Sequence, residues 1–509
     1  MVTPARAAPG EPDGQLLRLR SASGRIALAA TVLASSAALL DSTVANVALP
    51  RIGEEFGGDL GTLQWVITGY LLTLASFILL GGALGDRYGQ RRIFRLGAVW
   101  FALASLGCAL APSLPLLVAA RVVQGVGAAL LTPTALALTQ SSFVREERGA
   151  AVGAWSGLGG VAAAIGPLFG GWMVDGPGWR WAFLLNLPLI AGALLATRSI
   201  PETVDETLIG DADGHGTARS FDLVGAVLGA VALGTATWAL TQGPERGWSD
   251  SLVLGGTVLA LVLGAGFVLR QRTAPNPLVP HGLFGSRTFT VLNIATFALY
   301  ATLSGQFFLL AYQLQVSAGW SALEAGSALL PSTLLMLMLS ERSGALAARV
   351  GPRAQLIVGP LLIATAQVLL SSVDERTRWA TDVLPGALLF GFGLVAFVAP
   401  LTASVMASVE PSHVGTASGV NNAIARTAGL TAIAVIPVVS GLSTASGPAE
   451  TTAAFRVGML ITAGLAAVAA VIAAVGLPRH VATRDSSRKF YCAVDGAPAQ
   501  VCEETRESG

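Results

Sequence analysis

Long apolar runs separated by short polar segments make up nearly the whole chain. A helix needs about 20 apolar residues to cross a hydrocarbon core of about 30 Å, and fourteen runs approach that length. The first six cover 26–50, 62–84, 96–111, 116–140, 149–174 and 181–197; the next two cover 223–241 and 252–269; the last six cover 289–313, 322–348, 356–370, 383–408, 415–439 and 455–477. The pattern predicts an all-α polytopic membrane protein with about 14 transmembrane helices.

Composition supports this fold class and excludes several others. Of 509 residues, 53% are hydrophobic and only 12% are charged, against about 25% charged in soluble proteins. The 60 glycines and 25 prolines lie largely within apolar runs, as membrane helices tolerate. A soluble enzyme, a fibrous protein and a disulfide-rich secreted domain are excluded. The net charge of +1 gives no sign of a nucleic-acid partner, and no metal-ligand cluster or nucleophile–base arrangement suggests an enzyme.

The placement of basic residues predicts the orientation, because cytoplasmic loops carry the excess of Arg and Lys. With both termini cytoplasmic, the inside segments hold 22 of the 31 basic residues and the outside loops hold six. The remaining three are Arg121, Arg342 and Arg426, which lie within runs. The polar, basic residues 1–25 show no cleavable signal peptide. We therefore expect both ends inside.

An internal repeat divides the chain into two related halves. GALGDRYGQR at 82–91 shares six of ten residues with GALAARVGPR at 344–353, 262 positions later. At an offset of 266, Gly149 and Gly153 align with Gly415 and Gly419. Repeated halves with a site at their interface are typical of secondary transporters. We expect two six-helix bundles, 26–197 and 287–477, joined by two linker helices in 223–286. Residues 1–25, 198–222 and 478–509 are then a cytoplasmic tail, loop and tail.

Two buried charges lie at similar depth in the first half. Asp41 is roughly 22 Å from the cytoplasmic start of its run, and Arg121 is roughly 8 Å from the outer boundary of its own. Intramembrane ionisable residues usually face inward, pair, and lie on ion or proton paths. We expect Asp41 and Arg121 to face one cavity and to be electrostatically coupled, so that protonation of Asp41 repositions Arg121 or a substrate. The alternative is a static ion pair that fixes two helices. Ala387 aligns with Arg121 in the second half.

Other polar residues within the runs suggest a central cavity. Arg426, with Asn421 and Asn422 about one turn before it, is explained equally by a solvated cavity and by helix–helix hydrogen bonds. Ser321 and Glu324 have the spacing of a capping box. Further candidates for a substrate cavity are Asn46, Gln64, Trp65, Tyr70, Gln124, Tyr312 and Gln315.

The loop at 82–92 closely resembles the signature loop of the major facilitator superfamily. Its residues are Gly82, Asp86, Arg87, Gly89, Arg91 and Arg92. The resemblance implies that they form a cytoplasmic latch between the halves during alternating access. Ala348 aligns with Asp86 in the second copy, so we expect the latch to be one-sided.

Three further stretches are similar to the fourteen-spanner drug:proton antiporters of that superfamily. LDSTVANVALP at 40–50 looks like the first-helix signature, and RVVQGVG at 121–127 looks like a motif whose Arg is implicated in proton coupling. Gly157, Gly166, Pro167, Gly170 and Gly171 match the antiporter motif, for which generic small-residue packing is the alternative. The resemblance covers residues from about 26 to 477.

The resemblance implies a proton-driven antiporter that exports drugs or other amphipathic small molecules across the plasma membrane by alternating access. Asp41 and Arg121 would couple transport to protons, with the proton gradient as energy source and no cofactor. We expect a bacterial, monomeric protein whose partners are substrate, protons and the lipid bilayer. Three alternatives stay open: a dedicated exporter of one endogenous metabolite or antibiotic, an uptake symporter, which Gly166 and Pro167 disfavour, and a non-transporting membrane sensor.

Overall fold

The computed structural model describes residues 16–144, 147–199, 222–275, 277–278, 281–409 and 414–478. Within these ranges the chain consists of helices joined by turns and loops and contains no strand; an isolated bridge joins Leu17 to Phe143. The prediction of an all-α protein is confirmed.

The first half contains seven helices because its sixth run is broken. The bounds are α1 (Ala22–Phe56), α2 (Leu60–Tyr88), α3 (Gln90–Ala109), α4 (Leu114–Ser141), α5 (Arg148–Asp175), α6 (Trp179–Leu184) and α7 (Asn186–Ala196). The linker pair that follows is α8 (Leu223–Arg246) and α9 (Ser251–Thr273). Aspartate side chains at Asp59, Asp222 and Asp250 accept backbone N–H bonds where α2, α8 and α9 begin, as N-caps do.

The second half begins with the short α10 and repeats the pattern. Its helices are α10 (His281–Gly285), α11 (Arg287–Val316), α12 (Ala322–Ser327), α13 (Leu330–Val350), α14 (Arg353–Leu370), α15 (Leu384–Ala407), α16 (Val414–Val439) and α17 (Pro448–Gly476). The predicted capping box is confirmed: Ser321 accepts from the N–H of Glu324, whose carboxylate accepts from the N–H of Ser321.

When α6 is counted with α7, α12 is counted with α13 and the short α10 is left out, fourteen helical segments account for the fourteen predicted runs. Thirteen are long and apolar enough to cross a membrane within the described residues, and the run at 149–174 corresponds to the 28-residue α5. The structure divides two runs that hydropathy treats as continuous: 181–197 becomes α6 and α7, and 322–348 becomes α12 and α13.

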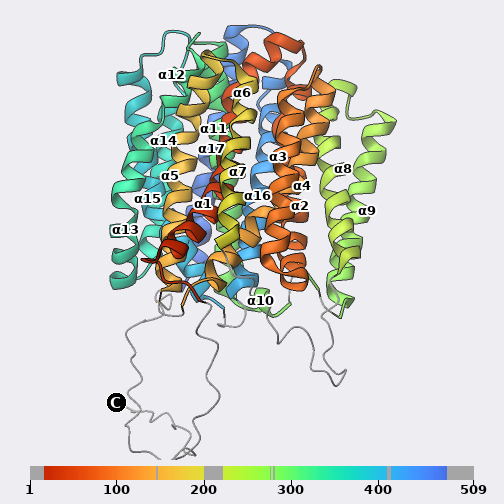
Figure 1. Cartoon of the computed structure of the whole chain (residues 1–509). Coiled ribbons are helices and arrows are strands. Elements are labelled where there is room, and N and C mark those ends of the chain that lie inside the picture. Colours follow the sequence, from red (N-terminus) through yellow and green to blue (C-terminus); the bar gives the residue numbers. More distant parts are fainter. Residues whose placement is uncertain are drawn as a thin grey trace, which may run out of the picture.

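The packing of the second half reproduces that of the first. In the first half α1 packs on α5 and α7, and α4 packs on α2 and α3; in the second half α11 packs on α16 and α17, and α15 packs on α13 and α14. The linker helices stand at one side of the bundle, where α8 contacts α2 and α16 and α9 packs on α8 (Figure 1). The sequence repeat is therefore also a structural repeat.

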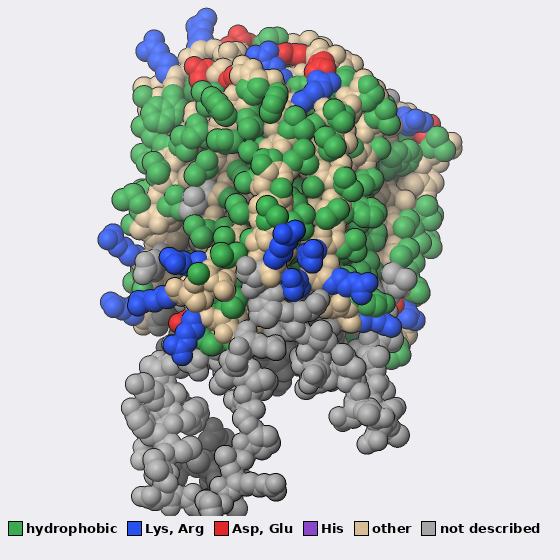
Figure 2. All heavy atoms as spheres, in the orientation of Figure 1, with side chains coloured by type: hydrophobic (Ala, Val, Ile, Leu, Met, Phe, Trp, Pro, Cys, Tyr) green, Lys and Arg blue, Asp and Glu red, His purple; other side chains and the backbone are tan. Residues whose placement is uncertain are grey.

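The surface agrees with a membrane environment. On the face shown in Figure 2, hydrophobic side chains form a broad belt, and most charged side chains gather toward its two ends. Figure 1 shows α6 and α12 near one end of the bundle and α10 near the other. We call these the α12 end and the α10 end.

Candidate functional site

Asp41 on α1 and Arg121 on α4 form an ion pair in the interior of the first half. Arg121 Nη1 donates to Asp41 Oδ2, and neither side chain has solvent-accessible surface. The two residues that the depth estimate placed at one level are thus in direct contact. Taking two charges out of water is costly unless further hydrogen bonds satisfy them, so their surroundings decide what the pair can do.

Three polar side chains complete the environment of the carboxylate. Gln124 Nε2 and Asn186 Nδ2 each donate to Asp41 Oδ1 over 2.9 Å. The same two amide groups donate to Ser105 Oγ over 2.7 and 3.2 Å. The network therefore ties together four helices, α1, α3, α4 and α7, around one carboxylate.

The guanidinium of Arg121 is held from its other sides. Its Nε donates to the carbonyl oxygen of Val66 over 2.8 Å, and its Nη1 also donates to Gln124 Oε1 over 2.6 Å. The ring of Tyr70 lies below it with 4.3 Å between the ring centroid and Cζ, which is within cation–π range. Arg121 thus depends on Asp41 for its negative partner while α2 and α4 fix its position.

This geometry makes the network sensitive to one proton. An ionised carboxylate only accepts hydrogen bonds, whereas a protonated one also donates. Both oxygens of Asp41 face N–H donors. Oδ1 already accepts two N–H bonds, so a proton on it would displace Gln124 or Asn186, and a proton on Oδ2 would remove the negative charge that Arg121 Nη1 pairs with.

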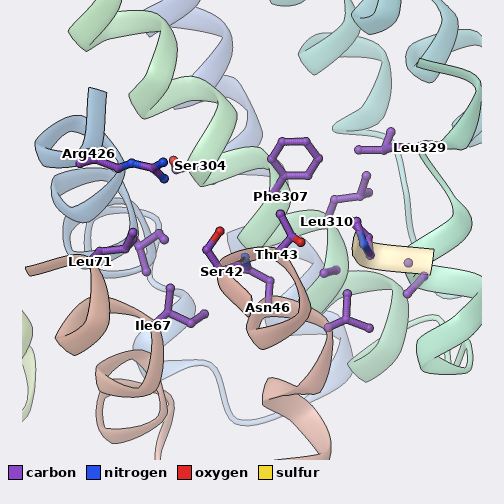
Figure 3. A pocket seen from close by; sticks show the side chains of 16 residues that line it. Ser42, Thr43, Asn46, Ile67, Leu71, Ser304, Phe307, Leu310, Leu329 and Arg426 are labelled. Carbon is purple, nitrogen blue, oxygen red and sulfur yellow. Dashed lines mark hydrogen bonds between the residues drawn. The ribbon is translucent and has the colours of Figure 1, made fainter. Parts of the chain in front are cut away.

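A cavity of about 140 Å³ lies between the two halves. The first half contributes residues of α1, α2 and α5, and the second half contributes residues of α11, α12 and α16. Its polar lining residues include Ser42, Thr43, Asn46, Ser304 and Arg426 (Figure 3). Ser42 and Thr43 directly follow Asp41 on α1, so one helix connects the ion pair to the cavity.

The other predicted cavity residues lie elsewhere. Tyr70 and Gln124 surround the ion pair. Tyr312 stacks on Phe308, and Gln315 donates to the backbone of its own helix. Asn421 donates to Asn293 and Thr296. The amide groups of Gln124, Gln315 and Asn421 thus form hydrogen bonds with other groups of the helix bundle and do not face the cavity. Three further predicted residues are also absent from its lining: Gln64, Trp65 and Asn422.

The antiporter motif lies where α5 contacts both halves. Gly166 and Gly170 face Thr43 and Val44 of α1. Gly171 faces the backbone of Ala322 and Leu323, and Pro167 lines the cavity. Gly157 lies outside the residues whose surroundings are described.

At the α12 end, the two halves are joined by Asp175, the last residue of α5. Its carboxylate accepts from the backbone N–H groups of Ala322 and Leu323 over 3.1 and 2.7 Å. A carboxylate at a helix N-terminus is favourable because of the free N–H groups and the helix dipole. Nearby, a Cβ on Gly326 of α12 would overlap the carbonyl oxygen of Pro167. The α12 end of the interface is therefore closed by direct backbone contact.

The signature loop joins α2 to α3 at the α10 end. Gly89 has φ = +93°, a conformation that favours glycine. The Cζ atom of Arg87 lies 5.4 Å from the ring centroid of Tyr88. Arg92 is exposed, and Arg91 is half-buried. Gly82 is half-buried and faces Pro133. The side chain of Asp86 lies outside the described residues, so the latch stays a prediction.

Sequence reasoning did not assign roles to Ser105, Asn186 and Asp175. A serine in a helix rich in small residues carries no distinctive pattern. The usable signal for Asn186 was a polar amide within an apolar run, which is the feature that marked Gln124.

Comparison with known proteins gives one family. The model of the Major Facilitator Superfamily matches residues 31–433, and a second match covers 292–490. A puromycin resistance protein of Streptomyces alboniger is 36% identical over 419 residues, covering 80% of each chain. A tetracenomycin C resistance and export protein of Streptomyces glaucescens is 33% identical over 400 residues, covering 79% of this chain and 73% of that protein.

Two further similarities agree with these. The multidrug resistance protein Stp of Mycobacterium tuberculosis is 32% identical over 400 residues, covering 78% of this chain and 72% of its own. Among solved structures, the inward-open xylose transporter XylE from E. coli aligns with a TM-score of 0.59 at 13% identity, covering 90% of this chain and 96% of that one. At that identity the structural match shows the fold alone.

Proposed function

The chain belongs to the major facilitator superfamily, and we propose that it is a proton-driven antiporter that exports amphipathic small molecules. The observation that carries this proposal is the buried Asp41–Arg121 network on the helix that also lines the cavity between the halves. The similar proteins of known role are resistance and export proteins, which favours export over uptake. The protein is a multi-pass membrane protein; a bacterial plasma membrane, with both termini cytoplasmic, belongs to the proposal.

In the proposed cycle, the α12 end faces outward. Closure there through Asp175, Gly171 and Gly326 leaves the cavity to receive substrate from the α10 end, which faces the cytoplasm. Protonation of Asp41 breaks hydrogen bonds among α1, α3, α4 and α7 and so changes the position of α1. Because Ser42, Thr43 and Asn46 lie on α1, the same movement changes the cavity. The proton gradient supplies the energy, the chain works as a monomer, and no cofactor is required.

A dedicated exporter of one compound is the second candidate function. It is favoured by the names of two similar proteins, each of which refers to a single antibiotic. The cavity volume of about 140 Å³ is below the 300–1,000 Å³ of most small-molecule pockets. Either function requires the cavity to widen when the halves separate.

Export is tested by accumulation in a bacterial strain that lacks its own efflux pumps. Cells that express the full chain receive rhodamine 123, chloramphenicol or fluorescein, so that a cation, a neutral compound and an anion are compared. We expect lower accumulation of at least one compound, and loss of the difference when a protonophore collapses the gradient. Equal accumulation of all three with and without the protein contradicts export. Export that persists with the protonophore contradicts proton coupling.

A further inference from the structure

Arg426 is the charged side chain of the cavity, and it has no acidic partner there. The sixteen lining residues include this one arginine and no Asp or Glu. The guanidinium points into the cavity toward Ser304 (Figure 3). Among the described residues no ion pair involves Arg426, and its buried Nε has no hydrogen-bond partner. The cavity between the halves therefore carries an uncompensated positive charge.

The arginine in the interior of the first half, by contrast, has an acidic partner. Arg121 is buried in the bundle and Asp41 compensates its charge, whereas Arg426 is half-buried with a buried Nε. A cation held partly out of water without a partner is unfavourable, and that cost is relieved when an anion binds it. Arginine offers N–H donors in a planar fork that matches the two oxygens of a carboxylate. Ser304 beside it adds a hydroxyl that can donate to the same group.

We propose that the cavity binds the anionic group of its substrates through Arg426, so that the exported compounds are amphipathic acids, carrying a carboxylate or an ionised phenol. That these compounds are exported rests on the proposed function, whereas their negative charge is inferred from the cavity alone. The remaining lining fits such a compound, since Phe307, Leu310 and Leu71 contribute apolar surface to the same cavity.

Membrane energetics agree with an anionic cargo. A charge that crosses the membrane gains or loses free energy in proportion to the membrane potential. A cell is negative inside, so an anion that leaves the cell moves down this potential. Proton entry moves down it as well. Exchange of an organic anion for a proton is therefore driven twice by the same potential, whereas exchange of a monovalent cation for one proton moves no net charge.

The test is equilibrium binding to the purified full chain in phosphatidylcholine nanodiscs. Fluorescein and rhodamine 123 share a xanthene ring system but are an anion and a cation at pH 7.4, and fluorescence anisotropy reports their binding. We expect fluorescein to bind the wild type with a Kd at least about tenfold below that of rhodamine 123, since a hydrogen bond to a charged group contributes about 1.5–3 kcal/mol. R426Q is expected to weaken fluorescein binding about tenfold or more without weakening rhodamine 123, and R426K, which keeps the charge but loses the planar fork, to bind fluorescein with an intermediate Kd. The matched control is R246Q, which removes an exposed arginine of α8.

A second measurement on the wild type needs no variant. 1-Naphthoate is expected to displace fluorescein, while the uncharged 1-naphthamide is not. Equal displacement by the two compounds, equal binding of the two dyes, absence of saturable fluorescein binding, or an unchanged Kd in R426Q overturns the proposal. Because binding is measured without a gradient, these results are separate from the test of export. Export of rhodamine 123 without fluorescein binding contradicts the anionic cargo alone, whereas intact fluorescein binding without export contradicts the antiporter alone.

Discussion

Gln306 on α11 and Gln367 on α14 form an uncharged hydrogen bond in the second half, between the two helices whose packing corresponds to that of α1 and α3. Both glutamines are fully buried, and Ala387 stands where the first half has Arg121. The same packing arrangement is thus built once with an ion pair and once with neutral side chains. An ion pair is not needed to hold this arrangement together, which favours a coupling role for Asp41 over the static alternative.

The first prediction concerns the stability of the ion pair. D41N leaves Arg121 buried without a negative partner, which typically costs about 3–5 kcal/mol. The double variant D41N/R121Q leaves a neutral pair and is expected to recover most of that loss. The measurement is the apparent Tm of the purified chain in detergent. A double variant that is no more stable than D41N would show that the cost does not come from the unpaired charge.

The second prediction concerns the close approach of α5 and α12. A methyl group at Gly326 cannot fit against the carbonyl oxygen of Pro167, so G326A should separate the halves at the α12 end. Leu110 follows α3 in the first half, Glu375 follows α14 in the second half, and both are exposed. Spin labels at these two positions, after exchange of Cys492 and Cys502 for Ser, should report a distance distribution shifted to longer distances. G464A is the control, since a Cβ there meets no atom within 4 Å. An unchanged distribution in G326A, or the same change in G464A, contradicts closure at this contact.

The third prediction concerns Asp175. D175N keeps the size of the side chain but loses the negative charge at the N-terminus of α12, a contribution of about 0.3–1 kcal/mol. The same spin labels should show the open population increased about two- to fivefold. D250N is the matched control, because Asp250 caps its own helix, α9. The assignment of Asp175 as a link between the halves fails if D250N opens the α12 end as much as D175N does.

The sequence predicted the fold because membrane spans leave a simple signal. Each run must satisfy its own backbone in lipid, so length and hydropathy indicate fourteen helices. The breaks at Leu185 and at 328–329 were missed, since a helix that changes direction inside protein keeps the same apolar composition. Asp41 and Arg121 could be paired from depth alone, because so few charges compete for partners inside the membrane.

The rest of the site depends on which faces of the helices meet. Asn186 reaches Asp41 through the packing of α7 on α1, and Ser105 joins the network through Asn186 and Gln124; no spacing along the chain indicates either contact. The sequence places Tyr70 and Gln124 among the candidates for the substrate cavity, but in the structure they contact the ion pair. Asn46 and Arg426 line the cavity between the halves, because each lies on the side of its helix that faces the other half; that the cavity receives substrate stays a prediction.

The most direct test of proton coupling through Asp41 is proton movement into proteoliposomes that enclose a pH-sensitive dye. The substrate is a compound that the wild type exports from cells, applied as a gradient across the vesicle membrane. The wild type is expected to move protons when the gradient is applied, and R246Q should match it. D41N/R121Q, which is expected to fold and to bind the compound, should move none. Substrate-dependent proton movement at the wild-type rate in D41N/R121Q would contradict coupling through Asp41.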